Sequence, residues 1–282
     1  MTLREDFSRA LSDYYPKDEI DTFFFMILEK IANCTKSDYI LNPNIGLNPE
    51  QICFFEQSIA QLKQYQPIQY ILGYAYFYDS KFVVNPNVLI PRPETEELVD
   101  WIVQTHQHKR QLRILDIGTG SGAIAISLSK KLDAKVFAFD ISEEALEVSQ
   151  RNADYNNCFV HWIKFDILND IWKGESFDVI VSNPPYVREC EKEQMQPNVL
   201  NYEPHLALFV PDQDPLKYYK SIAQFAATHL KKDGYLFLEI NQYLASETLD
   251  VVQKHFSECI LKKDLFDNYR MILATNTSGP TL

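Results

Sequence analysis

The chain has 282 residues, 46% of them hydrophobic and 23% charged, which is the composition of a folded globular protein with room for one large and one small domain. The formal net charge of −12 disfavours non-specific binding to DNA or RNA, which needs a basic face, so no direct nucleic-acid partner is expected. The apolar run Phe23–Leu28 is far too short to span a bilayer, and the N-terminus lacks a signal-peptide pattern. We therefore expect a cytoplasmic protein with no membrane partner.

The first 65 residues carry only helical patterns. Asn48 is expected to cap the start of a helix, because Pro49 follows at the first helical position and Gln51 at the third. Behind it, apolar residues recur at helical spacing and form one stripe, made of Ile52, Phe55, Ile59 and Leu62. An earlier helix is expected at about 17–33. Because neither helix can bury its apolar face alone, we predict that residues 1–65 form a small helical bundle.

Between residues 66 and 90 the period of the apolar residues changes. Tyr70–Tyr78 and Lys81–Val84 are expected as two short strands, separated by a turn at Asp79 and Ser80. Prolines at positions 86, 91 and 93 suit loop or edge positions. We predict a β-hairpin linker over residues 66–90.

From residue 91 to residue 282, strands and helices alternate. Strands are expected near 112–117, 135–139, 159–164, 177–182 and 235–240, followed by two more at the end of the chain. Helices are expected near 94–107, 121–131, 142–155, 215–231 and 242–256. This alternation predicts an α/β fold with a doubly wound, mostly parallel sheet of seven strands.

Three of the eight glycines lie in one short loop. The loop, Asp116–Gly122, follows an apolar strand and opens a helix, and its glycines allow a tight turn and the close approach of a ligand to the backbone. The same pattern satisfies the dinucleotide fingerprint, with Asp140 at the distance along the chain expected for a ribose contact. The loop alone therefore leaves a nicotinamide dinucleotide and S-adenosylmethionine both open.

Acidic residues at three strand ends favour S-adenosylmethionine. Asp116 would repel a pyrophosphate, whereas S-adenosylmethionine carries an ammonium and a sulfonium and no phosphate. Asp140 is expected on the ribose hydroxyls, and Asp166 on the adenine amino group with Ile167 packed on the ring. The alternatives are that Asp116 anchors the loop and that Asp166 starts a turn. The candidate cofactor-binding residues are Asp116, Gly118, Thr119, Gly120, Ser121, Gly122, Asp140, Asp166, Ile167 and Asn183.

A second motif, Asn183–Tyr186, ends the strand 177–182. In open α/β sheets ligands bind beyond the carboxyl ends of the strands, where the strand order reverses, so we expect this motif to face the glycine loop. An amide or exocyclic amine nitrogen is a poor nucleophile that must be held and aimed. The side-chain oxygen of Asn183 and the carbonyl of Pro184 are expected to accept its two N–H groups, while Tyr186 stacks on the planar acceptor.

The candidate catalytic residues are thus Asn183, Pro184 and Tyr186, and Pro185 joins them as a substrate-binding residue. The alternative is an ordinary Asx-Pro turn that ends a strand. The five cysteines are odd in number and never two residues apart, and the histidines are spread along the chain. We therefore expect no disulfide framework and no metal site.

These motifs together resemble the HemK-type peptide-chain release factor glutamine methyltransferases. The resemblance runs nearly end to end. The segments that carry it are Pro67–Gly73, Leu89–Glu96, Asp116–Gly122 and Asn183–Tyr186, with weaker support from Tyr202–Leu208, Asp264, Leu265 and Arg270. The tetrapeptide alone is less specific, because DNA adenine methylases and RNA methylases share its type.

The resemblance implies a class I methyltransferase domain over residues 91–282. It implies transfer of a methyl group from S-adenosylmethionine, leaving S-adenosylhomocysteine, to the side-chain nitrogen (N5) of the glutamine in the Gly-Gly-Gln loop of translation release factors. It also implies that residues 1–65 help to dock the release factor, and we expect the enzyme to act as a monomer. Asn241 and Ile167 depart from the family pattern, which often has Gly and a larger aromatic residue there; we expect neither to touch the acceptor site.

Four alternatives remain. A glutamine methyltransferase acting on a ribosomal protein would share the catalytic residues. An N6-adenine methyltransferase acting on DNA or RNA would need a basic groove, which the acidic composition disfavours. An inactive adaptor is disfavoured by the intact Asn183–Tyr186 motif, and an NAD oxidoreductase by Asp116.

Overall fold

The computed structural model describes residues 2–276, which form two compact units. One unit is the chain up to Gly73 together with the short segment Gln196–Tyr202. The other is Tyr74–Met195 together with the chain from Glu203 onward. The first break thus falls after Gly73, several residues later than the boundary expected at 65, and a segment from the second half of the chain returns to the helical unit.

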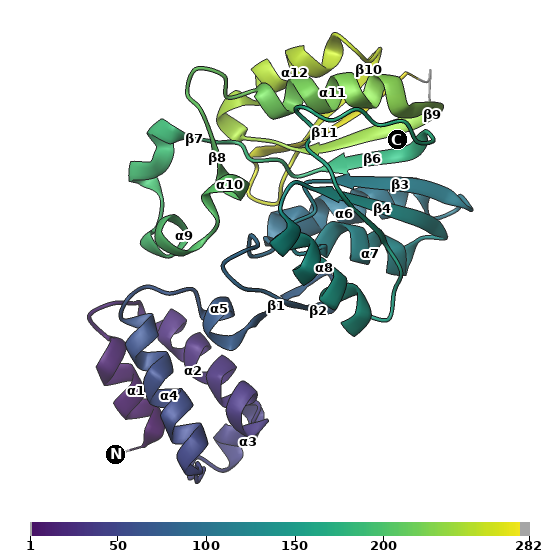
Figure 1. Cartoon of the computed structure of the whole chain (residues 1–282). Helices are drawn as coiled ribbons and strands as arrows, with labels where there is room; N and C mark the ends of the chain where they lie inside the picture. The colour runs from purple at the N-terminus through teal and green to yellow at the C-terminus, as the bar shows by residue number, and fades with distance from the viewer. Residues whose placement is uncertain (1, 277–282) are drawn as a thin grey trace. The chain divides into compact units, whose positions relative to one another are not determined.

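The helical unit confirms the expected bundle (Figure 1). Its core includes Phe7, whose ring lies 5.6 Å from that of Phe24 and 5.3 Å from that of Phe55, measured between centroids. The predicted start at Asn48 is a reciprocal cap, in which its side chain accepts from the Gln51 N–H at 2.9 Å. The helices are α1 (Leu3–Leu11), α2 (Lys17–Ala32), α3 (Lys36–Leu41), α4 (Pro49–Leu62), α5 (Ile68–Leu72) and α9 (Pro197–Tyr202).

The strand expected from Tyr70 is wrong in its first half, because Ile68–Leu72 forms helix α5. Pro67 precedes this helix, and Gly73 ends it in the left-handed conformation, with φ of 76°. The hairpin itself is confirmed but shorter. It pairs β1 (Tyr74–Phe77) with β2 (Ser80–Val83) in antiparallel register.

The second unit contains the expected seven-stranded, mostly parallel sheet, with strand order β10-β11-β9-β6-β3-β4-β5 within the described residues. Only β11 runs antiparallel to both of its neighbours, β9 and β10. The strands are β3 (Leu112–Ile117), β4 (Ala134–Asp140), β5 (His161–Lys164), β6 (Phe177–Ser182), β9 (Leu230–Glu239), β10 (Glu258–Lys263) and β11 (Tyr269–Thr275).

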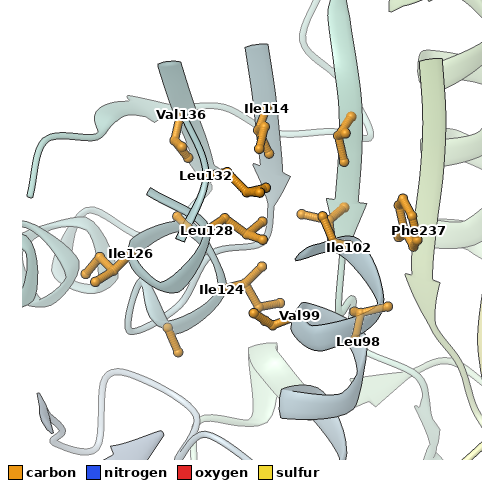
Figure 2. Packing of buried hydrophobic residues seen from close by; sticks show 14 of the residues in the cluster. Leu98, Val99, Ile102, Ile114, Ile124, Ile126, Leu128, Leu132, Val136 and Phe237 are labelled. Atoms are coloured by element: carbon orange, nitrogen blue, oxygen red, sulfur yellow. The ribbon is translucent and has the colours of Figure 1, made fainter. Parts of the chain in front are cut away.

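Helices cover both faces of this sheet, as a doubly wound fold requires (Figure 1). One face carries α6 (Pro93–His106), α7 (Ala123–Lys131) and α8 (Glu143–Tyr155), and the other carries α11 (Lys217–His229) and α12 (Ala245–Gln253). Two buried apolar clusters fill the two interfaces. Figure 2 shows the first, where Val99 of α6 and Ile124 of α7 lie beneath strand residues such as Ile114.

Several short elements between β6 and α11 have no counterpart among the sequence-based predictions. They are β7 (Val187–Arg188), η1 (Glu189–Gln194), α9, α10 (His205–Leu208) and β8 (Phe209–Val210). Farther along, the helix expected at 242–256 begins as the 3-10 turn η2 (Gln242–Leu244) before α12. Among residues 2–276, no helix has the length and apolar character needed to cross a membrane.

Candidate active site

The two sequence motifs meet because β3 and β6 are neighbouring parallel strands. Ile117 at the end of β3 pairs with Ser182 at the end of β6, and the Ser182 hydroxyl donates to the Ile117 carbonyl at 2.7 Å. The glycine loop and the Asn183–Tyr186 motif therefore leave the sheet side by side at its carboxyl edge. This is the place where open α/β sheets bind ligands, as predicted.

A cavity of about 470 Å³ lies at this edge. Of the predicted site residues, the cavity is lined by Gly118, Gly120, Asp140, Asp166, Ile167, Asn183, Pro184 and Pro185. Outside the lining lie Asp116, Thr119, Ser121, Gly122 and Tyr186. The structure thus brings eight predicted residues to one cavity and leaves the other five outside its lining.

The backbone conformation of the glycine loop would be strained by any residue other than glycine at three positions. Gly118, Gly120 and Gly122 all have φ between 54° and 80°, in the region that favours glycine. A Cβ on Gly122 would also come within 3.0 Å of the Cβ of Ser149 and of the Trp162 ring. The Gly118 N–H donates to the Phe139 carbonyl at 2.9 Å, which fixes the loop against the end of β4.

Asp116 lies beneath this loop. Its carboxylate is fully buried and accepts the Thr119 hydroxyl at 2.6 Å. Burial raises the pKa of Asp116 to about 7, against the lowering effect of the Thr119 hydrogen bond. This geometry supports the interpretation in which Asp116 anchors the loop, and a direct cofactor contact stays a prediction.

Asp140 lines the cavity at the end of β4. One carboxylate oxygen accepts the Gly120 N–H at 2.8 Å and the other accepts the Ser142 N–H at 3.0 Å. Burial raises the pKa of Asp140, while these backbone hydrogen bonds lower it. The side chain is therefore held rigidly toward the position where the sequence predicts the ribose.

Asp166 starts a turn, as one of its two alternative interpretations expects, and it also lines the cavity. Its carboxylate accepts the Leu168 N–H at 2.9 Å and the Asn169 side-chain amide at 2.7 Å, which makes it the start of a turn. It also lines the cavity, together with the neighbouring Ile167. The turn presents both residues to the cavity, and their contact with an adenine ring stays a prediction.

The charged side chains that line the cavity, among the described residues, are all acidic. The lining includes the acidic residues Asp140, Glu144 and Asp166, and among the described residues that line the cavity there is no Lys, Arg or His. A pyrophosphate would find no counter-charge here, whereas a sulfonium or ammonium ion is favoured. The cavity therefore suits a cationic cofactor better than a dinucleotide.

Behind the acceptor motif lies a buried carboxylate that the sequence-based reasoning did not assign. Glu239, the last residue of β9, accepts the Tyr186 hydroxyl at 3.0 Å and the Thr95 hydroxyl at 2.6 Å. Thr95 in turn accepts the side-chain amide of Asn183 at 3.2 Å. An acidic residue that ends a buried strand is the same signal that singled out Asp116 and Asp140, so the sequence did carry a clue to Glu239.

The expectation that Asn241 does not touch the acceptor motif is wrong. Its side-chain Nδ2 donates to the Tyr186 carbonyl at 3.0 Å and to Glu191 at 3.2 Å. Asn241 is buried, so these bonds tie the motif firmly to the end of β9. The residue that departs from the family pattern therefore supports the motif.

Other lining residues come from segments that carry no motif. Pro86–Leu89 follows the hairpin, and the next residue, Ile90, donates its N–H to the buried Glu203 at 3.2 Å. Arg92 pairs with the same carboxylate at 2.5 Å. Both contacts span more than a hundred residues of sequence, which is why spacing alone did not predict them. Further lining comes from Leu206, Ala207, Tyr218 and Ile222.

Two family models match parts of this chain. Residues 2–73 match the family described as the PrmC N-terminal domain, and residues 95–201 match the methyltransferase small domain. The chain is 47% identical to a release factor glutamine methyltransferase of Flavobacterium psychrophilum, over 95% of this chain and 96% of the relative. It is 43% identical to one of Bacteroides thetaiotaomicron, over 94% of this chain and 96% of that relative.

Solved structures share the fold at lower identity. A 16S rRNA N2 G1207 methyltransferase of Thermus thermophilus, in complex with AdoMet and guanosine, is 17% identical with a TM-score of 0.53, over 72% of this chain and 50% of that chain. A methyltransferase from Pyrococcus furiosus is 22% identical with a TM-score of 0.51, over 69% of this chain and 88% of that chain. At these identities the likeness shows the fold alone.

Proposed function

The chain belongs to the release factor glutamine methyltransferase family, and on that basis we propose that it transfers a methyl group from S-adenosylmethionine to the side-chain N5 of the glutamine in the Gly-Gly-Gln loop of a translation release factor. The observation that carries the proposal is the convergence of the glycine loop and Asn183–Pro185 on one cavity, where the lining residues that the structure describes include no Lys, Arg or His. The product of the cofactor is S-adenosylhomocysteine.

The cavity fits S-adenosylmethionine. The positive φ angles at Gly118 and Gly120 leave the backbone open to a close-lying ligand. Asp140 offers a fixed carboxylate for the ribose hydroxyls, and Ile167 offers an apolar surface for the adenine. When bound, the cofactor supplies an electrophilic methyl group, and the acidic lining favours its positive charge.

The acceptor nitrogen is oriented by groups that do not titrate. We propose that the side-chain oxygen of Asn183 and the carbonyl of Pro184 accept its two N–H groups, while Pro185 forms part of the wall. The two prolines stiffen this backbone. Rate enhancement then comes from holding the nitrogen in line with the methyl group. Tyr186 supports the motif through Glu239, and ring stacking on the acceptor is a further part of the proposal.

The helical unit is the proposed docking element for the release factor. None of the described residues that line the cavity comes from this unit, which supports a role in docking and not in methyl transfer itself. The match of residues 2–73 to a family domain of its own supports a distinct task. We expect the enzyme to act as a cytoplasmic monomer, without direct binding to nucleic acid.

The proposal is tested by supplying S-adenosylmethionine with a labelled methyl group and three acceptors in separate reactions. The acceptors are a full-length release factor, ribosomal proteins, and a mixture of DNA and RNA. We expect label in the release factor alone. Label only in a ribosomal protein, or only in adenine, would replace the proposal with one of its two methyltransferase alternatives. Absence of label in all three would favour an inactive adaptor.

A further inference from the structure

We propose that Thr95 and Glu239 are positioning residues that hold the Asn183 amide with its oxygen toward the cavity. This inference rests on the proposed function, because it concerns how the acceptor nitrogen is oriented. Three segments far apart in the sequence meet here: Thr95 lies in the first turn of α6, Glu239 ends β9, and Asn183 follows β6. None of the sequence-based site assignments includes Thr95 or Glu239.

The direction of the hydrogen bonds follows from counting protons. An ionised carboxylate can only accept, so both hydroxyls that contact Glu239, those of Thr95 and Tyr186, must donate to it. A hydroxyl has a single proton. Because the Thr95 hydroxyl uses this proton in the hydrogen bond that it donates to Glu239, its oxygen can only accept a hydrogen bond from Asn183.

This count decides the orientation of the Asn183 amide. An asparagine side chain can be turned so that either its oxygen or its nitrogen faces a given neighbour. Because Thr95 must accept, the Nδ2 group faces Thr95 at 3.2 Å. The opposite end of the planar amide, Oδ1, is then left for the cavity that Asn183 lines. The N–H of the glutamine that accepts the methyl group needs an oxygen of Asn183 to donate to. If the Asn183 amide were turned, its NH2 group would face this N–H, and the two hydrogen-bond donors would repel each other.

Burial makes the arrangement stiff. Thr95 is 5% exposed and Glu239 is 1% exposed, so water does not compete for either group. Burial has the largest effect and raises the pKa of Glu239, and the two hydroxyl hydrogen bonds and the positive charge of Arg270 act against this rise. Asp264 holds Arg270, with 3.0 Å between Nε and Oδ2. The carboxylate of Glu239 thus accepts two hydrogen bonds and experiences the positive charge of Arg270.

The experiment compares Thr95→Val with Thr95→Ser. Valine keeps the shape and removes the hydroxyl, whereas serine keeps the hydroxyl. Thr248→Val is the matched control, because Thr248 is also buried but its hydroxyl donates to the backbone carbonyl of Leu244, four residues earlier in the chain, at 2.7 Å. For each protein, we measure kcat and KM with a full-length release factor, the dissociation constant for S-adenosylmethionine, and the melting temperature.

We expect kcat of Thr95→Val to fall by about tenfold or more, since the acceptor is misoriented. The KM and the cofactor dissociation constant should stay within about threefold of the wild type, because neither rests on this hydroxyl. Thr95→Ser should recover most of kcat, and Thr248→Val should lose thermal stability without losing kcat. Glu239→Leu is the second variant: it removes both oxygens that accept from Thr95 and Tyr186, so the Thr95 hydroxyl is free to donate to Asn183 instead, and kcat should fall again.

Wild-type kcat in Thr95→Val, or equal losses of kcat in the valine and serine variants, would overturn the positioning role. So would a loss of kcat that only tracks the melting temperature across Thr95→Val and Thr248→Val. If Thr95→Val does not fold, full kcat in Glu239→Leu would overturn the role in its place. Failure of the proposed function is a separate outcome, because the wild-type enzyme itself would then leave the release factor unmethylated.

Discussion

Asp140 is the proposed contact for the ribose hydroxyls of the cofactor. Two backbone N–H groups fix its carboxylate at the cavity wall. Asp140→Asn keeps the shape and removes the charge, so we expect S-adenosylmethionine to bind more weakly by about 1.5–3 kcal/mol, the value of hydrogen bonds to a charged group. Calorimetry checks this, with Asp250→Asn on the exposed face of α12 as the control. Equal affinity in both variants would contradict the ribose contact.

Asp116 makes a prediction about pH, because burial raises its pKa from 3.8 to about 7. Below about pH 4 the carboxyl is protonated in both the folded and the unfolded chain, and its contribution to stability is fully present. As the pH rises toward 7, the unfolded chain ionises first, so the free energy of unfolding falls. Above about pH 7 the folded chain ionises too and the loss levels off.

Asp116→Asn removes this titration. Between pH 5 and pH 8, the free energy of unfolding of the cofactor-free wild type should therefore fall by about 2–3 kcal/mol more than that of the variant. Urea denaturation at several pH values measures both curves, and all other titrating groups cancel in the difference. Curves that run parallel would show that Asp116 is ionised in the folded protein across this range.

The glycine loop is the element on which the cavity depends, and Gly122 is its tightest position. Alanine there would need a left-handed backbone and a Cβ within 3.0 Å of two neighbouring side chains. Positions held in such conformations cost about 1–3 kcal/mol, so Gly122→Ala should lower the free energy of unfolding by at least this amount and weaken cofactor binding. Gly46→Ala, with nothing within 4 Å, should be close to neutral in both measurements. A neutral Gly122→Ala would contradict the loop geometry.

The elements that the sequence predicts well are those with a long and regular pattern. The strands β3 and β6 match their expected ranges because apolar runs ending in a motif leave little choice. Helix α5 was missed because five residues are too few to show a helical period, and its aromatic and branched residues resemble a strand. Its two ends, Pro67 and Gly73, were the better signal.

The candidate site likewise contains residues that the sequence predicts and residues that it does not. Residues in contiguous motifs or directly after expected strands were predicted, and eight of them line the cavity. Thr95 and Glu239 were not, because their contact joins residues 144 positions apart and exists only once α6 packs beside β9. One sequence cannot reveal such a pairing, although an acidic residue at the end of a buried strand is a reason to look for its partner.

At the scale of the whole molecule, the division into two units predicts a division of labour. A chain that starts at Tyr74 retains every residue that lines the cavity, so we expect it to bind S-adenosylmethionine within about threefold of the full chain. Methylation of an intact release factor should be severely weakened, mainly through KM. Circular dichroism and calorimetry establish folding and cofactor binding first. A folded variant that methylates the intact factor as well as the full chain would contradict the docking role.

The central claim is that the cavity aims one glutamine nitrogen at the methyl group, and single-turnover transfer to a release factor tests it most directly. Peptide mapping of the product should place the methyl group on the glutamine of the Gly-Gly-Gln loop. Asn183→Ala should slow this transfer by on the order of 10²-fold, as misplaced reactants do, while cofactor affinity changes little. A methyl group on any other residue, or an undiminished rate in Asn183→Ala, would contradict the account.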